Sequence, residues 1–175
     1  MAIALIYGYQ LRSNETESAH TPGSTLTPQH AQTASIVGQH APGFELTDLN
    51  GRLRTSSEWS QRAQVINFWA NWCEPCVREL PLLQTLSQQP QYRDIAFVTI
   101  SIDDFETRRR FAETHQLELL VLGGGAQAIA VAEAYGNTLG LLPYTVFVTS
   151  DQKIDSIHIG ELNKTALTGT LSTLQ

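Results

Sequence analysis

The sequence predicts an α/β protein with a central mixed β-sheet that is flanked by helices and extended by an N-terminal β-hairpin. Three features of the 175 residues lead to this class. Strand and helix patterns alternate from residue 41 onward, two continuous apolar runs of strand length occur at 65–69 and 95–102, and a short turn joins the last two strand patterns. Fully apolar strands require helices on both faces of their sheet, and parallel strands require helical crossovers.

The first part of this domain predicts a hairpin, a buried strand and a helix. Segment 44–54 (FELTDLNGRLR) alternates between apolar and polar residues around Asn50-Gly51, a dipeptide that suits a tight hairpin turn. The apolar strand at 65–69 leads into a helix at 73–86, where Pro81 should kink the axis. The buried face of this helix consists of four residues at helical spacing: Val77, Leu80, Leu83 and Leu86.

The remaining elements continue the alternation. Asp104 and Asn163 each precede a helical pattern and suit the N-cap position, whereas Gly136 ends a helix. The expected elements are a strand at 95–102, a helix to about residue 116, a strand at 119–122, a helix at 126–135, strands at 144–148 and 154–159, and a closing helix. Right-handed crossovers bring the end of the 65–69 strand and the start of the next helix to one rim, where α/β folds place their chemistry.

Two segments precede the domain, which we place at residues 40–175. Residues 1–11 (MAIALIYGYQL) are apolar but shorter than a membrane span, and they are either the remnant of a membrane anchor or a loosely docked start. Residues 12–39 are rich in Ser, Thr, Gln and Pro, and we interpret them as a flexible linker. Histidines occur at 20, 30 and 40, but a tether without a fixed scaffold makes a poor metal site.

Composition and charge exclude several classes of function. The net charge of −6 and the pI of about 5.3 provide no basic surface, so we expect no nucleic-acid partner and no binding to anionic lipid. The only two cysteines, Cys73 and Cys76, are too close together to stabilise a fold by closing a long loop. Their role is therefore predicted to be chemical.

The motif NFWANWCEPCVRELP, residues 67–81, places both cysteines where a strand turns into a helix. The Cys73 sulfur should lie beside the first backbone N–H groups of the helix, whose partial positive charge stabilises a thiolate and lowers the pKa of the thiol. Cys73 is therefore the expected nucleophile, and Cys76, one helical turn further, can resolve a mixed disulfide at Cys73. Pro75 suits an early helical position, and the Glu74 carboxylate should raise the pKa of the thiol.

Two other roles for the dithiol are weaker. A zinc site would need two more ligands, and without a further cysteine it would have to recruit His115 or His158. A purely structural pair in the core is also unfavourable, because the flanking Trp72 and Pro75 suit a turn better than the centre of a packed helix. We therefore assign the pair to redox exchange, with no metal and no cofactor beyond the Cys73–Cys76 disulfide.

The motif, preceded by APGFELTDLNG and followed by LLPYTVFVTSDQKI, resembles the thioredoxin superfamily and, within it, the periplasmic TlpA/ResA/CcmG-like disulfide reductases. The resemblance covers residues 40–175 and implies a thioredoxin-like fold with an N-terminal hairpin extension. Pro81 matches the family's helix-kinking proline, and Pro143 matches its cis-proline, which packs beside the dithiol. Leu142 and Pro143 are thus candidate substrate-binding residues, and so are Trp72 and Pro75 beside the sulfurs.

Two polar positions refine the resemblance. Asn67 stands where ordinary thioredoxins carry a buried aspartate that assists proton transfer, so that this assistance should be missing. Glu79 follows the second cysteine by three residues and matches an acidic residue that family members use near the dithiol, so we expect it to manage a proton during catalysis. The alternative for Glu79 is an exposed helix carboxylate paired with Arg78 or another cation.

The resemblance also implies an activity, partners and a compartment. It implies a protein thiol-disulfide oxidoreductase that reduces oxidised cysteine-containing proteins, such as apocytochrome c during cytochrome maturation. A membrane dithiol donor of the DsbD/CcdA type would recharge it. The expected protein is a periplasmic or otherwise extracytoplasmic monomer, tethered to the inner membrane if residues 1–11 belong to an anchor. Its substrate preference stays open, because segment 137–142 (NTLGLL) is longer than expected and Tyr144 replaces a small or polar residue.

Two different functions remain as alternatives. A peroxiredoxin-like peroxidase is one, because APGFELTDLNG also occurs in that relative, although Ala70 stands where such a peroxidase carries a hydroxyl residue. A copper-binding metallochaperone that uses the dithiol as its ligand pair is the other.

Overall fold

Apolar strands and amphipathic helices alternate along residues 36–174, the part of the chain that the computed structural model describes. The predicted segment 1–11 and most of the predicted linker lie outside these residues. In chain order the elements are β1 (Glu45–Asp48), β2 (Leu53–Thr55), the short 3-10 helix η1 (Ser56–Trp59), β3 (Ala63–Trp69), α1 (Glu74–Ser87), the 3-10 helix η2 (Pro90–Tyr92), β4 (Ile95–Ser101), α2 (Phe105–Thr114), β5 (Leu120–Gly123), α3 (Ala126–Ala134), β6 (Tyr144–Val148), β7 (Ile154–Ile159) and α4 (Lys164–Thr173).

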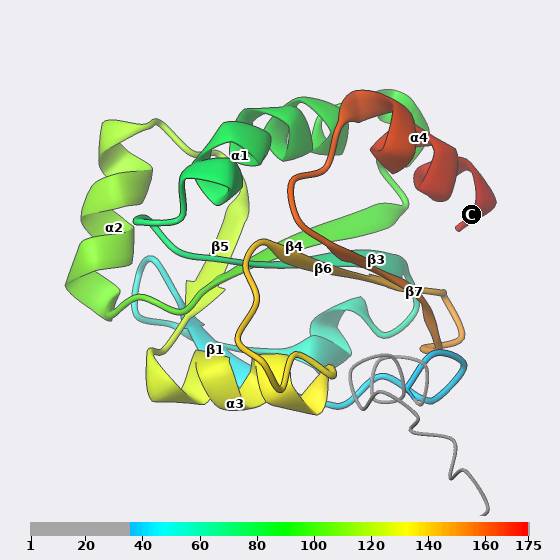
Figure 1. Cartoon of the computed structure of the whole chain (residues 1–175), viewed down its shortest axis with the longest axis horizontal. Coiled ribbons are helices and arrows are strands. Elements are labelled where there is room, and N and C mark those ends of the chain that lie inside the picture. Colours follow the sequence, from blue (N-terminus) through cyan, green and yellow to red (C-terminus); the bar gives the residue numbers. More distant parts are fainter. Residues whose placement is uncertain (1–35, 175) are drawn as a thin grey trace, which may run out of the picture.

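The strands form one seven-stranded mixed sheet in the order β2-β1-β5-β4-β3-β6-β7. The three central strands β3, β4 and β5 are parallel, and antiparallel pairs extend the sheet on both sides. Helices α1 and α4 cover one face, whereas α3 covers the other (Figure 1). The structure thus confirms the predicted α/β thioredoxin-like class with its N-terminal hairpin.

Local signals in the sequence account for the ends of these elements. In the hairpin, Gly51 has a φ of +75°, and the Asp48 carboxylate accepts hydrogen bonds from the backbone of Asn50 and Arg52 at 2.9 and 3.0 Å. Asp104 accepts from the Thr107 backbone at 2.9 Å and so caps α2, as predicted. Asn163 caps α4 in the same way, through the Ala166 backbone at 2.9 Å.

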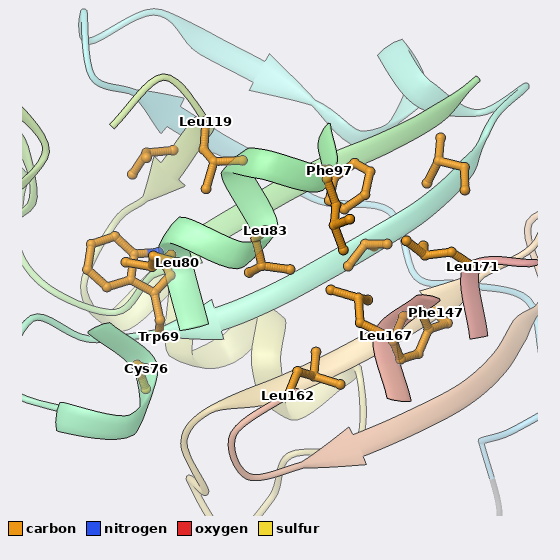
Figure 2. Close-up of a cluster of buried hydrophobic side chains, with 14 of the residues drawn as sticks. Trp69, Cys76, Leu80, Leu83, Phe97, Leu119, Phe147, Leu162, Leu167 and Leu171 are labelled. Carbon is orange, nitrogen blue, oxygen red and sulfur yellow. The ribbon is translucent and has the colours of Figure 1, made fainter. Parts of the chain in front are cut away.

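Two buried clusters, one on each side of the sheet, form the core. Strands β3 and β4 are buried along their full length, as their continuous apolar runs predict. The cluster beneath α1 and α4 includes Leu80 and Leu83 of α1 and Leu167 of α4 (Figure 2). One end of this cluster contains Trp69, at the end of β3, and Cys76. The packing of the core therefore reaches directly to the dithiol.

The packed domain begins earlier than residue 40. The Gly38 backbone donates to Ile154 O at 2.7 Å, and the Ile154 backbone donates to Gln39 O at 2.9 Å. Ile36 packs against the cluster beneath α3. The last residues of the predicted linker are therefore part of the domain. Within residues 36–174, no helix is both long and apolar enough to cross a membrane.

Candidate active site

The two cysteines form a disulfide at the start of α1, with their Cα atoms 5.2 Å apart. Cys73 is the N-cap residue, with extended backbone, and its carbonyl accepts the first bond of the helix from Val77 at 3.0 Å. Cys76 follows one turn into the helix. Cys73 is 6% exposed and Cys76 is fully buried. Only Cys73 therefore meets solvent, and it does so where the positive end of the helix dipole lies.

The turn that presents Cys73 is held by hydrogen bonds within the turn and by hydrogen bonds to the residues that follow strand β4. The Cys73 backbone donates to Ala70 O at 3.1 Å, which closes the turn. The Ile102 backbone, just after β4, donates to Trp69 O at 3.0 Å. The Asn71 backbone donates to the Asp103 carboxylate at 2.8 Å. The parallel pair β3–β4 thus continues past its last residues into the active-site turn.

Arg78 of α1 pairs with two surface carboxylates, one from its own helix and one from the segment before α4. Arg78 Nη1 lies 2.8 Å from Glu74 Oε1, and its Nη2 lies 2.7 Å from Glu161 Oε2. These two carboxylates, rather than Glu79, are the partners of Arg78. The exposed ion pair also offsets part of the negative charge that Glu74 brings to the start of the helix.

Glu79 lies on the inner side of α1 and is 1% exposed. Its Oε1 accepts a hydrogen bond from Asn67 Nδ2 at 2.7 Å, and its Oε2 accepts one from the Leu162 backbone at 2.8 Å. Burial raises the pKa of Glu79 to about 7, although both hydrogen bonds act to lower it. A carboxyl group that titrates near neutral pH can both take up and release a proton there. The structure thus gives Glu79 a buried position instead of the exposed alternative.

Asn67 connects Glu79 to strand β6. Its Nδ2 also donates to Thr145 Oγ1 at 2.9 Å, whereas its buried Oδ1 has no hydrogen-bond partner within the described residues. The Asn67 amide has no titratable proton, but it donates a hydrogen bond to Glu79, which has one. Thr145 and the Leu162 backbone are parts of the site that the sequence alone did not reveal, because both lie far from the motif in the chain.

The candidate substrate-binding residues come from two segments: Trp72 and Pro75 flank Cys73 in the chain, whereas Leu142 and Pro143 directly precede strand β6. The Leu142–Pro143 peptide is cis, as the resemblance implies. Phe68 of β3 pairs with Tyr144 of β6, so the next residues, Trp69 and Pro143, lie at the rim that carries the dithiol. Leu142 is half-buried and packs against both core clusters. Trp72 is 69% exposed and projects into solvent beside Cys73, whereas Pro75 is half-buried.

The longer segment 137–142 before the cis peptide is an ordered loop. The buried Asn137 side chain donates to Leu141 O and accepts from Leu141 N, both at 2.8 Å. With these two hydrogen bonds in place, Leu139 and Leu141 face solvent, where they are 61% and 40% exposed. The unusual Tyr144 is buried, and its hydroxyl donates to Tyr135 O at 2.9 Å. The sequence indicated the extra length but not the bonds that shape it.

The residues considered for a metal do not gather around the dithiol. Within residues 36–174 there is no group of three or more His, Cys, Asp or Glu side chains that could hold a metal ion. His115 instead stacks on Phe111, with ring centroids 4.1 Å apart. His158 lies on the edge strand β7, where it pairs with Thr145 of β6.

Comparisons with known proteins agree with this arrangement. The AhpC/TSA family model matches residues 37–157. The thiol-disulfide oxidoreductase ResA of Geobacillus thermodenitrificans is 31% identical over 135 residues, which are 76% of this chain and 75% of that protein. The thioredoxin-like protein YneN of Bacillus subtilis is 31% identical over 134 residues, which are 73% and 74% of the two chains.

Solved structures share the fold at lower sequence identity. A thiol:disulfide interchange protein of Chlorobium tepidum aligns with a TM-score of 0.67 and 20% identity over 77% of this chain and 94% of that one. The exposed lipoprotein thioredoxin Etrx1 of Streptococcus pneumoniae aligns with a TM-score of 0.67 and 22% identity over 76% and 100% of the two chains. Matched over most of its described domain, the chain belongs to the AhpC/TSA family of thioredoxin-like proteins, as a relative of the ResA thiol-disulfide oxidoreductases.

Proposed function

We propose that the protein is a thiol-disulfide oxidoreductase that reduces disulfides in other proteins. The observation that carries this proposal is the Cys73–Cys76 disulfide at the N-terminus of α1. The exposure of the two sulfurs supports the assignment of their roles. An incoming substrate can reach Cys73, which is 6% exposed, but not Cys76, which is fully buried.

The reaction consists of two exchange steps. In the reduced protein, the Cys73 thiolate attacks one sulfur of a substrate disulfide, which breaks the substrate S–S bond and releases one substrate thiolate. Cys76 then loses its proton and attacks the Cys73 sulfur, which forms the Cys73–Cys76 bond and releases the second substrate thiolate. Two electrons pass from the dithiol to the substrate, and an external dithiol must reduce the protein before the next turnover.

Glu79 is proposed to accept the proton of Cys76. Its position three residues further along α1, its burial and its pKa of about 7 support this role. Glu79→Gln removes the titrating group but keeps nearly the same shape. We expect it to slow the release of product from the mixed disulfide by about a hundredfold near neutral pH. Glu113→Gln, which removes an exposed carboxylate from α2, is the control.

We place this reaction outside the cytoplasm, where the substrate would be an oxidised cysteine protein such as apocytochrome c. A membrane dithiol donor of the DsbD/CcdA type would supply the electrons, and the protein would act as a monomer. The names of the relatives support this setting, since they include ResA thiol-disulfide oxidoreductases and an exposed lipoprotein thioredoxin. Trp72, Leu142 and Pro143 are the proposed contacts to the substrate.

A trapping experiment tests the proposal. Cys76→Ser should accumulate a mixed disulfide with its protein substrate, visible on a non-reducing gel and identified by mass spectrometry. Cys73→Ser should trap nothing. The proposal fails if both variants trap equally or if neither does. Turnover of peroxide by the wild-type protein would favour the peroxidase alternative, and equal loss of copper binding in both variants without any trapping would favour the metallochaperone.

A further inference from the structure

We propose that Asp103 is a positioning residue for Cys73, which it holds in place through the backbone of the active-site turn. Asp103 follows strand β4 and precedes the N-cap of α2, thirty residues after the nucleophile in the chain. The inference rests on the proposed function, in which Cys73 is the attacking sulfur. It concerns the geometry of that sulfur and not a new reacting group.

The Asp103 carboxylate binds the turn directly. Its Oδ2 accepts a hydrogen bond from the Asn71 backbone at 2.8 Å and a second one from Ser101 Oγ at 2.9 Å. The Asp103 backbone in turn donates to Ser101 Oγ at 3.0 Å. Asp103 is 9% exposed and Ser101 is fully buried. Bonds from an N–H to a carboxylate are stronger than bonds between neutral groups, and partial burial strengthens them further.

This arrangement fastens the turn to the rigid part of the sheet. Ser101 is the last residue of β4 and pairs with Trp69 of β3 on one side and Gly123 of β5 on the other. The carboxylate is therefore anchored to the end of the central strand of the sheet. The contact reaches the backbone of residue 71, so the side chain of Asn71, which is exposed, is not required for it.

The position of the turn determines the position of the sulfur. Residues 70–73 connect β3 to α1, and the described residues show one bond that closes them, from the Cys73 backbone to Ala70 O at 3.1 Å. A thiolate at residue 73 gains stabilisation from the helix only while it stays near the first N–H groups of α1. Loss of the Asp103 bond would leave a backbone N–H unpaired and let the turn move away from this geometry.

The neighbouring carboxylate provides a natural control. Asp104 is exposed, and its side chain bonds within its own helix, to the Thr107 backbone at 2.9 Å and to Thr107 Oγ1 at 2.8 Å. It carries the same charge one residue away but makes no bond to the active-site turn. A change at Asp104 therefore removes a carboxylate and weakens α2 without altering the support of residue 71.

The experiment measures the rate at which iodoacetamide alkylates Cys73, as a function of pH, in a Cys76→Ser background so that one thiol reacts. We expect Asp103→Ala to slow alkylation at pH 7 by about fivefold, because the thiolate loses the stabilisation of the helix terminus. Asp103→Asn, whose amide oxygen can accept both bonds, should restore the rate to within about twofold. Asp104→Ala should also stay within about twofold, although its unfolding midpoint falls.

Several results would overturn the proposal. It is wrong if Asp103→Ala reacts at the same rate as Asp104→Ala, or if the Ala and Asn variants both react faster by the same factor, since the carboxylate would then act through its charge alone. If Asp103→Ala does not fold, Asp103→Glu keeps the charge but displaces the carboxylate, and an unchanged rate in that variant contradicts positioning. Failure of the proposed function looks different, because the parent Cys73 would then react no faster than an unstructured thiol.

Discussion

Glu79 and Arg108 are both buried and ionisable, yet their surroundings suit them to opposite roles. Both residues are only 1% exposed. Glu79 lies on α1 behind the dithiol, and burial raises its pKa to about 7. Arg108 lies on α2, where burial lowers its pKa below the ordinary arginine value, against the influence of Asp104, Asp48 and Asp103. An arginine nevertheless keeps its charge at neutral pH.

The difference shows which buried charge can serve chemistry and which serves structure. Arg108 Nη2 donates to Thr47 O at 3.1 Å and to Thr47 Oγ1 at 2.7 Å, which fastens the hairpin strand β1 to α2. The guanidinium also lies 4.9 Å from the centroid of the Phe105 ring. Gly123 leaves room for this side chain, because a Cβ there would lie 2.9 Å from Arg108 Cδ. Glu79 can therefore gain or lose a proton near neutral pH, whereas Arg108 stays charged and holds two elements together.

The largest effect that separates the two residues should be the pH dependence of stability. Between the ordinary pKa of 4.5 and the raised value of about 7, the folded protein keeps a proton on Glu79 that the unfolded chain has lost. The folded state therefore loses stability as the pH rises through this window, by about 3 kcal/mol in total. Urea unfolding of the oxidised protein from pH 4 to pH 8 measures this change.

Glu79→Gln should remove that part of the pH dependence. The quantity to compare is the slope of the free energy of unfolding against pH in the wild-type protein and in the variant, because all other groups titrate equally in both. Glu74→Gln, whose side chain is 87% exposed, should leave the slope unchanged. Parallel curves for the wild-type protein and Glu79→Gln would show that the buried carboxyl does not titrate in this range.

An effect of similar size should come from removing the buried Arg108 side chain. Arg108→Ala deletes a buried side chain and removes the hydrogen bonds that it donates to Thr47. We therefore expect the free energy of unfolding to fall by about 3 kcal/mol. Arg109→Ala on the same helix is the matched control, because its side chain is 44% exposed and its ion pairs with Glu106 and Glu113 lie on the surface. Equal loss of stability in the two variants would show that Arg108 has no special structural role.

The smallest effect should come from the Thr47 hydroxyl, which accepts a hydrogen bond from Arg108. Thr47→Val replaces the hydroxyl that accepts the 2.7 Å bond from Arg108 by a methyl group of similar size. We expect a loss of about 1 kcal/mol in the free energy of unfolding, whereas Thr47→Ser, which keeps the hydroxyl, should lose less. Urea unfolding of the Val and Ser variants measures both losses. A Val variant as stable as the wild-type protein would place the anchoring of β1 elsewhere.

Much of the fold follows from the local sequence. The alternating pattern around Asn50-Gly51, the apolar runs of β3 and β4 and the caps Asp104 and Asn163 all lie within a few residues of the structure they specify. The 3-10 helix η1 was not predicted, although it buries Trp59 in the core. One turn of 3-10 helix has too few residues for a periodic pattern to be visible.

The sequence by itself determined the dithiol, its place at the start of a helix and the order of the elements, because these depend on neighbours along the chain. Only the tertiary structure decided that Glu79 is buried, and that it contacts Asn67 from β3 and the Leu162 backbone. The same holds for the bond from Asp103 to residue 71. Each of these contacts joins segments that are far apart in the chain. Burial and partners set the pKa of a side chain and the position of a turn, and both arise only when the chain has folded.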